Sequence, residues 1–120
     1  MDAEIAGARE RVAQKIEARA LELRGRILVF MDRREEAENA LREALVIATR
    51  IEHPPVTWRA LSLTGEVARR QGNREIAERH FHEVRSLVES KASSIERDEL
   101  RNGLLAMGKQ LIADPLAAYR

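Results

Sequence analysis

The side chains best suited to catalysis or metal binding are three histidines and some neighbouring carboxylates. His80 and His82 are two positions apart, which places them about 200° apart around a helix, so a single helix cannot present both to one metal ion. His53 falls in an expected loop, and no second ligand at helical spacing completes a site with it. The paired carboxylates, Glu35-Glu36 and Asp98-Glu99, are typical of exposed helix faces. We therefore expect no metal site and no cofactor.

Motifs that carry catalysis are missing from the sequence. It has no glycine-rich phosphate loop, no Gly-x-Ser-x-Gly turn and no His-Glu-x-x-His helix. It also has no cysteine, which excludes a thiol nucleophile, a disulfide and a thiolate metal site. We expect the chain not to be an enzyme.

The charge balance indicates the classes of partner. The 120 residues carry 21 basic and 20 acidic side chains, a net charge of +1, whereas nucleic-acid binding needs an uncompensated basic surface. The longest apolar stretch, Ile27 to Met31, is far too short for a membrane span, and no secretion signal opens the chain. We expect a cytoplasmic protein that binds neither nucleic acid nor membrane directly.

The sequence contains an internal repeat. When residues 19–51 are aligned with residues 59–91, about ten pairs are identical. They include Leu21 with Leu61, Gly25 with Gly65, and Ala37 with Ala77. Because such units cannot bury their apolar faces alone, repeats of this length stack side by side.

Each unit is predicted to be a helical hairpin. The composition is 44% hydrophobic and only 3% aromatic, and the abundant Ala, Leu, Arg and Glu are strong helix formers. Two apolar stripes on the first helix, Leu21/Gly25/Leu28 and Leu23/Ile27/Phe30, predict that it is packed on both sides. The helices are expected at Lys15–Met31, Glu35–Ile51, Val56–Gln71, Arg74–Ser90 and Ile95–Ala113.

The ends of the chain extend this pattern. Asp2–Ala13 is expected to be a separate helix from a preceding, incomplete unit. Ser93 and Glu96 have the spacing of a capping box for the fifth helix, whose apolar stripe is Leu100/Leu104/Met107/Leu111, and Gly108 is a candidate break. The predicted organisation is one domain over 1–120: a partial helix (1–14), two repeats (15–51 and 55–90), and a capping helix with its tail (93–120).

The second unit resembles a tetratricopeptide repeat. The resemblance lies in Trp58-x-x-Leu61-x-x-x-Gly65-x-x-Ala68, followed by Gly72-Asn73-x-Glu75-x-Ala77-x-x-x-Phe81-x-x-Val84. The first unit repeats the pattern with Gly25, Ala37 and Leu41. The resemblance implies an all-α fold, a right-handed α-solenoid of antiparallel hairpins. It also implies that the chain binds a peptide or a partner helix on the concave surface.

Two features depart from the family. The spacing from Gly25 to Gly65 exceeds the family's usual repeat length of about 34 residues, and Leu28 and Ala68 stand where an aromatic is expected. Longer units of this kind resemble the helical sensor regions of bacterial signalling proteins, such as regulators of the maltose-activator type and cyclases with helical tails. Asp98-Glu99-Leu100-Arg101 resembles the closing helix of such regions. The chain is therefore expected to belong to bacterial signalling or transcriptional regulation, alone or as a fragment of a multidomain protein.

The predicted binding surface lies opposite the Leu21/Gly25/Leu28 stripe and its equivalent in the second unit. Its residues are Arg19, Glu22, Arg26 and Phe30 on the first helix, and Arg59, Ser62, Glu66, Arg69 and Arg70 on the third. Its arginines suit an acidic protein segment or a terminal carboxylate, through bidentate hydrogen bonds. In the alternative interpretation these arginines pair with Glu22 and Glu66 on an ordinary solvated face. The alternatives for function are self-association into a homodimer and a small-molecule sensor region.

Overall fold

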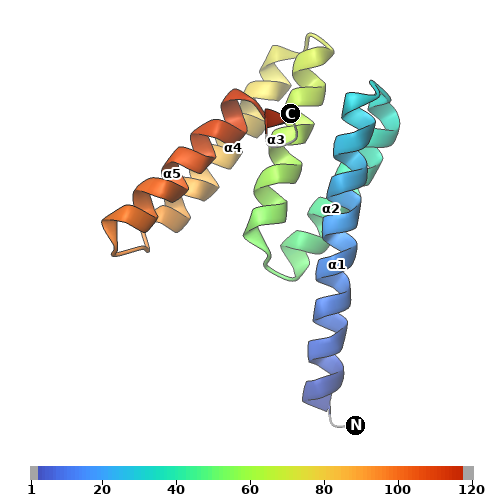
Figure 1. Cartoon of the computed structure of the whole chain (residues 1–120). Coiled ribbons are helices and arrows are strands. Elements are labelled where there is room, and N and C mark those ends of the chain that lie inside the picture. The colour runs from blue at the N-terminus through green and yellow to red at the C-terminus, as the bar shows by residue number, and fades with distance from the viewer. Residues whose placement is uncertain (1–2, 118–120) are drawn as a thin grey trace. The chain divides into compact units, whose positions relative to one another are not determined.

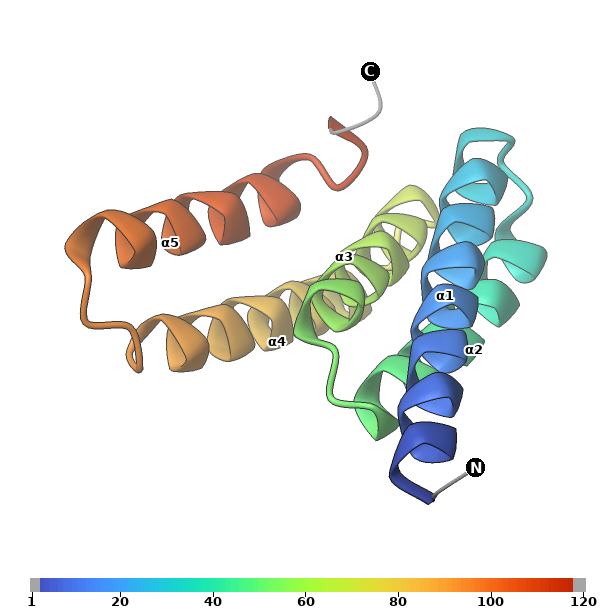
Figure 2. The same ribbon diagram turned by 60° about the horizontal axis from the view of Figure 1, so that its bottom comes forward.

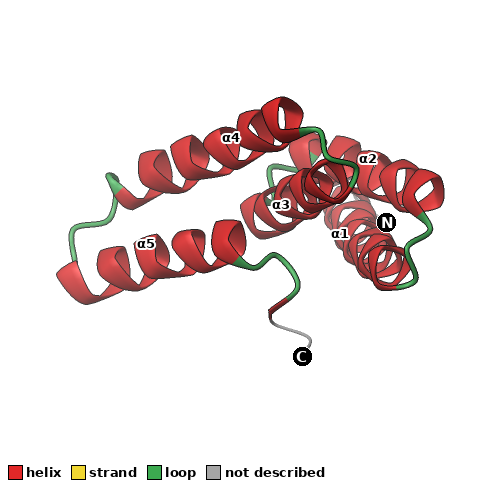
Figure 3. Ribbon diagram, turned by 90° about the horizontal axis from the view of Figure 1, so that it is seen from above, coloured by secondary structure: helices red, strands yellow, loops and turns green. Residues whose placement is uncertain are grey.

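The computed structural model describes residues 3–117 and shows an all-α protein. Within that range the secondary structure consists of five helices without a strand (Figures 1 and 3). The helices are α1 (Ala3–Phe30), α2 (Arg34–Arg50), α3 (Pro54–Arg70), α4 (Arg74–Ala92) and α5 (Asp98–Ala113). The all-α prediction is confirmed, and most helix boundaries lie within a few residues of those expected.

The chain divides into two compact units, residues 1–60 and residues 61–120. The first contains α1, α2 and the beginning of α3, and the second contains the remainder of α3 with α4 and α5. In the described residues, no helix has an apolar stretch long enough to cross a bilayer.

In the first unit, α1 and α2 form an antiparallel hairpin (Figure 1). Gly25 marks their closest approach, because a Cβ atom built on it would lie 2.6 Å from Cγ and Cδ2 of Leu41. Small side chains continue this contact in a buried cluster, against which Leu21 and Ile47 pack. The cluster consists of Ala18, Ala44, Ala48 and Val56.

The N-terminal part of the chain differs from the prediction. Residues 3–30 form one uninterrupted helix, so the segment expected as a separate helix at Asp2–Ala13 is the first part of α1, with Asp2 itself outside the described residues. The physical reason is that no proline or turn sequence separates Ala13 from Lys15, and Ala, Glu, Lys and Arg favour a continuous helix.

The second unit contains the equivalent close approach between α3 and α4. A Cβ atom on Gly65 would lie 2.6 Å from Cε1 of Phe81, so the contact of Gly25 with Leu41 recurs at the equivalent positions of the second repeat. Phe81 is buried with Ala68 and Ala77, and Ile112 of α5 packs against this cluster. Helices α4 and α5 run side by side in opposite directions (Figure 2).

Three expectations for α5 are wrong. The helix begins at Asp98 and its N-cap residue Arg97 makes no side-chain cap, while Ser93 is the C-cap of α4. Ser93 Oγ instead donates a hydrogen bond to the Ser90 carbonyl at 2.7 Å, so no capping box forms. The helix does not break at Gly108, because this buried glycine lets α5 approach α4: its Cβ would lie 2.8 Å from Cγ1 of Val88.

The expected apolar stripe of α5 is also displaced around the helix. Leu100 and Met107 are 55% and 36% exposed, whereas Gly108 and Ile112 face the other helices of the second unit. Leu104 and Leu111 of the expected stripe are partly buried, so the packing face of α5 includes part of that stripe together with Gly108 and Ile112.

The turns of the two hairpins have the same backbone geometry. Asp32 and Gly72, at equivalent positions of the two repeats, both have positive φ, at 58° and 79°. After α1, the Arg33 N–H donates to the Leu28 carbonyl at 2.9 Å, and after α3 the Asn73 N–H donates to the Ala68 carbonyl at 2.9 Å. This pattern is the Schellman type of helix end. Together with the two glycine contacts it is consistent with a helical repeat.

Candidate functional site

The predicted binding residues of the first unit do not form one open surface. Glu22 and Arg26 are 3% and 5% exposed, and Arg26 Nη2 donates to Glu22 Oε2 at 2.7 Å. Arg59 Nε, at the start of α3, donates to the other oxygen of Glu22. Burial lowers the pKa of the Arg26 guanidinium, the Glu22 carboxylate raises it, and the nearby Arg59 lowers it again. These three residues form an internal ion-pair network.

The predicted residues of the second unit have a similar arrangement. Ser62 is fully buried and Glu66 is 7% exposed. Glu66 accepts hydrogen bonds from Arg69 and, at 2.9 Å, from Arg70 Nε. The Arg69 guanidinium also lies 5.6 Å from the centre of the Phe81 ring. The pairing of arginines with Glu22 and Glu66 that the alternative interpretation expects is present in both units, but both carboxylates are buried and do not lie on a solvated face.

Two predicted residues, Arg19 and Phe30, belong to a different and more open surface. Together with Phe30, five apolar side chains on α1 are between 47% and 64% exposed. At about 100° per residue, the six lie within an arc of about 60° on α1. We call this surface the α1 apolar face; it consists of Ile5, Val12, Ile16, Leu23, Ile27 and Phe30.

The expectation that α1 is packed on both sides is therefore wrong. Its Leu21/Gly25/Leu28 side packs against α2, with Gly25 in the tight contact and Leu28 only 6% exposed. Leu23 and Ile27, on the second stripe, are each 48% exposed. The sequence signal was present in that stripe, but the division of α1 into two helices concealed its continuation through Ile5, Val12 and Ile16.

The same positions are buried in the second copy of the repeat. Leu63 and Val67, the equivalents of Leu23 and Ile27, are 1% and 2% exposed. Val56, the equivalent of Ile16, is fully buried. Half of the positions that form the α1 apolar face are therefore buried at the equivalent positions of the second repeat.

Basic side chains border the α1 apolar face. Arg9 and Arg19 lie about 30° and 50° from its centre line, and Lys15 and Arg24 lie about 90° from it, one on each side. All four are exposed, and none forms an ion pair with another residue in the range 3–117. The exposed acids of α1, which are Glu4, Glu10 and Glu17, lie about 110° or more from the centre line.

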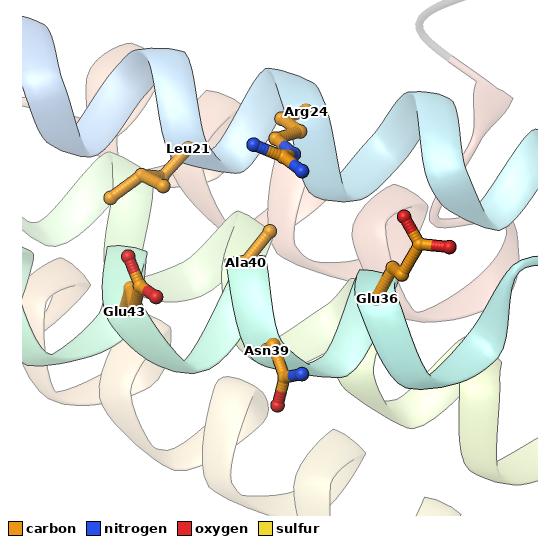
Figure 4. A pocket seen from close by; sticks show the side chains of 6 residues that line it. All are labelled: Leu21, Arg24, Glu36, Asn39, Ala40 and Glu43. Atoms are coloured by element: carbon orange, nitrogen blue, oxygen red, sulfur yellow. The ribbon is translucent and has the colours of Figure 1, made fainter.

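Small recesses lie between neighbouring helices in the described part of the chain. A recess of about 150 Å³ lies between α1 and α2 (Figure 4), and another of about 110 Å³ lies between α4 and α5. The first is lined by Leu21, Arg24, Glu36, Asn39, Ala40 and Glu43. Sites for organic ligands usually enclose roughly 300–1,000 Å³, so neither recess favours a small-molecule sensor. Among residues 3–117, no group of three or more His, Asp or Glu side chains could hold a metal ion.

The fold and this face define an all-α protein built from successive helical hairpins, with one amphipathic helix that is apolar on two sides. Comparisons of the chain with models of protein families, with curated proteins and with solved structures found no match.

Proposed function

We propose that the chain is a non-catalytic protein–protein interaction module of the tetratricopeptide type, which binds a peptide or a partner helix through the α1 apolar face. The observation that carries the proposal is the exposure of six large apolar side chains along one line of α1. Half exposure of six such side chains leaves an apolar area on the order of 600 Å². Patches of this size on a monomer are often functional.

The shape of this face suits an elongated partner. From Ile5 to Phe30 the face extends for about 37 Å along the helix axis. A partner helix of similar length could cover the whole face, and a typical interface buries about 800 Å² on each side. The polar border of α1 would supply the remaining area.

The repeated hairpin supports the tetratricopeptide assignment. The contacts of Gly25 with Leu41 and of Gly65 with Phe81 occupy the positions at which this family places its small residue and its inserted side chain. In proteins of this type the first helix of each pair lines the binding surface, and α1 is the first helix of its pair. By the same resemblance we propose a role in a cytoplasmic bacterial signalling or transcription-regulatory protein.

Self-association is the second candidate, because the same face could pair with that of a second copy. In that case the purified chain would be a dimer, and an aspartate at Leu23 would dissociate it. Sedimentation velocity on the wild type and on Leu23→Asp distinguishes this candidate from a module that binds a different protein.

The proposed function is tested with designed helical peptides. One peptide carries leucines at the spacing of Ile5, Val12, Ile16, Leu23, Ile27 and Phe30 with uncharged polar flanks, and its partner has the same composition in scrambled order. We expect the full chain to bind the first peptide at least ten-fold more tightly in fluorescence anisotropy. Equal affinity for the two peptides would overturn the proposal.

Matched variants locate the binding surface. Ile16→Asp and Leu23→Asp place a charge on the α1 apolar face at positions already about half exposed, so the fold is expected to persist. Val46→Asp in α2, where valine is 53% exposed, is the control for the same chemistry on another helix. We expect the first two variants to lose at least ten-fold in affinity and Val46→Asp to bind as the wild type does. Loss in all three, with circular dichroism unchanged, would contradict the assignment to α1.

A further inference from the structure

We propose that the natural occupant of the α1 apolar face is a helix of another protein whose apolar stripe is bordered by carboxylates. This inference rests on the proposed function and adds the chemistry of the partner. It is carried by the placement of the charges on α1, which the apolar residues alone do not explain.

Two arginines lie along the edges of the stripe. Arg9 falls between Ile5 and Val12, and Arg19 falls between Ile16 and Leu23, on opposite sides of the centre line. They are separated by about 15 Å along the helix axis. A wholly apolar partner would remove both guanidinium groups from water without replacing their hydrogen bonds, which is costly. Carboxylates opposite them would provide charge-assisted, bidentate bonds.

The residues that border the face are also positively charged. Lys15 and Arg24 flank the stripe, and Arg24 also lines the recess that contains Glu36 and Glu43 of α2, whereas Glu10 and Glu17 point away from the stripe. The buried acid of α1, Glu22, is already bonded to Arg26. The face therefore presents four cations around an apolar centre, and the complementary surface is apolar with an anionic border.

The same charges disfavour a second copy as the occupant. Pairing two α1 apolar faces would bring Arg9, Arg19, Lys15 and Arg24 of both copies to one interface. Like charges placed together in this way act against the wrong partner. The acids of α1 that could neutralise them lie about 110° or more from the centre line.

The spacing of the apolar residues favours a helix over a lipid surface. Successive members of the face follow one another at intervals of seven, four, seven, four and three positions, the intervals at which helices interlock their side chains. Phe30 is the one aromatic residue of the face, and Arg9 and Arg19 lie along its edges. A basic border also attracts anionic lipids, so a membrane is kept as an outcome of the test.

The test uses three helical peptides with the same leucine stripe, bordered by glutamate, glutamine or lysine. We expect affinity for the full chain to fall in that order, with at least a ten-fold difference between the glutamate and lysine peptides. The difference should shrink at high salt, because added ions screen exposed charges. The double variant Arg9→Glu/Arg19→Glu should reverse the order.

A matched double variant controls for net charge. Arg42→Glu/Arg79→Glu changes the charge by the same amount on α2 and α4, where both arginines are exposed, and should leave the order unchanged. If it abolishes the preference as fully as Arg9→Glu/Arg19→Glu does, the preference comes from the overall charge and the inference is overturned.

The remaining outcomes separate this inference from the proposed function. Equal, tight binding of all three peptides would leave the proposed function intact and overturn the acidic partner. Failure of every stripe peptide would overturn both. A dimer that the glutamate peptide cannot dissociate would assign the face to a second copy. Binding to phosphatidylserine vesicles, lost in Arg9→Glu/Arg19→Glu and not inhibited by the glutamate peptide, would assign it to lipid.

Discussion

Replacing Gly25 with alanine is expected to destabilise the protein, although alanine is the better helix former. The new Cβ would lie 2.6 Å from two carbons of Leu41, a side chain that is fully buried in α2. Overpacking a core in this way costs about 1–3 kcal/mol. The gain in helix propensity from glycine to alanine is about 1 kcal/mol, so the net change in the free energy of unfolding is a loss of about 0–2 kcal/mol.

The same helix supplies the control. Gly7 also lies in α1, and a Cβ on it would meet nothing within 4 Å. Gly7→Ala should therefore stabilise the protein through helix propensity alone, by at most about 1 kcal/mol. The difference between the stability changes of Gly25→Ala and Gly7→Ala cancels the contribution of helix propensity. It leaves the steric cost of the new methyl group at Gly25, about 1–3 kcal/mol. Urea unfolding followed by far-ultraviolet circular dichroism measures both.

A double-mutant cycle with Leu41→Ala tests the cause. Removing the leucine side chain leaves room for the new methyl group, so the cost of Gly25→Ala should largely disappear in that background. The coupling between the two positions is expected to be at least about 1 kcal/mol. The reasoning would be refuted by additive effects, or by a Gly25→Ala protein as stable as Gly7→Ala, since α1 and α2 would then not approach as closely as described.

Three further perturbations follow from the turns and helix ends. Burial and the positive charge of Lys15 lower the pKa of His53 in the folded protein. The unfolded chain therefore binds a proton at His53 more tightly than the folded protein does. The free energy of unfolding should fall as the pH drops below about 6.5. His53→Gln should remove that dependence in urea titrations at several pH values. Glu52 has a φ of 53°, and Glu52→Gly should raise stability by up to about 1 kcal/mol, as thermal unfolding would show. Asn73 caps α4 through its side chain, whereas Arg33, its equivalent in the first repeat, makes no side-chain cap of α2. Arg33→Asn should therefore raise the free energy of unfolding by about 1 kcal/mol, and Asn73→Ala should lower it by about 1 kcal/mol.

The sequence predicted the hairpins well because their signals are local. Turns are specified by a few neighbouring residues, as with the Gly72-Asn73 pair, and the close approaches at Gly25 and Gly65 follow from residues without a side chain. Asp32 adopts the geometry of Gly72, although it lacks the conformational freedom of glycine. The repeat indicated this equivalence where residue type alone did not.

Exposure was harder to predict, because periodicity shows which residues share a face but not whether anything covers it. Leu23 and Leu63 are the same residue at equivalent positions, yet their exposures are 48% and 1%. Ile27 and Val67 differ in the same way. The difference depends on what lies against each helix, which is a property of the folded chain and is absent from the helical pattern.

Burial of part of the predicted site was hard to foresee for a related reason, and it separates two kinds of arginine in this protein. Glu22 and Glu66 belong to the predicted surface because they lie opposite the apolar stripe of their helix, yet each is buried, since two arginines neutralise it. An acidic ligand at Arg59 or Arg70 would compete with a buried carboxylate and leave that carboxylate with one of its two arginines, which is costly for a buried charge. At Arg19 the same ligand would displace only water. The arginines that can recognise an acidic partner are therefore those that the fold leaves in solvent beside an apolar face.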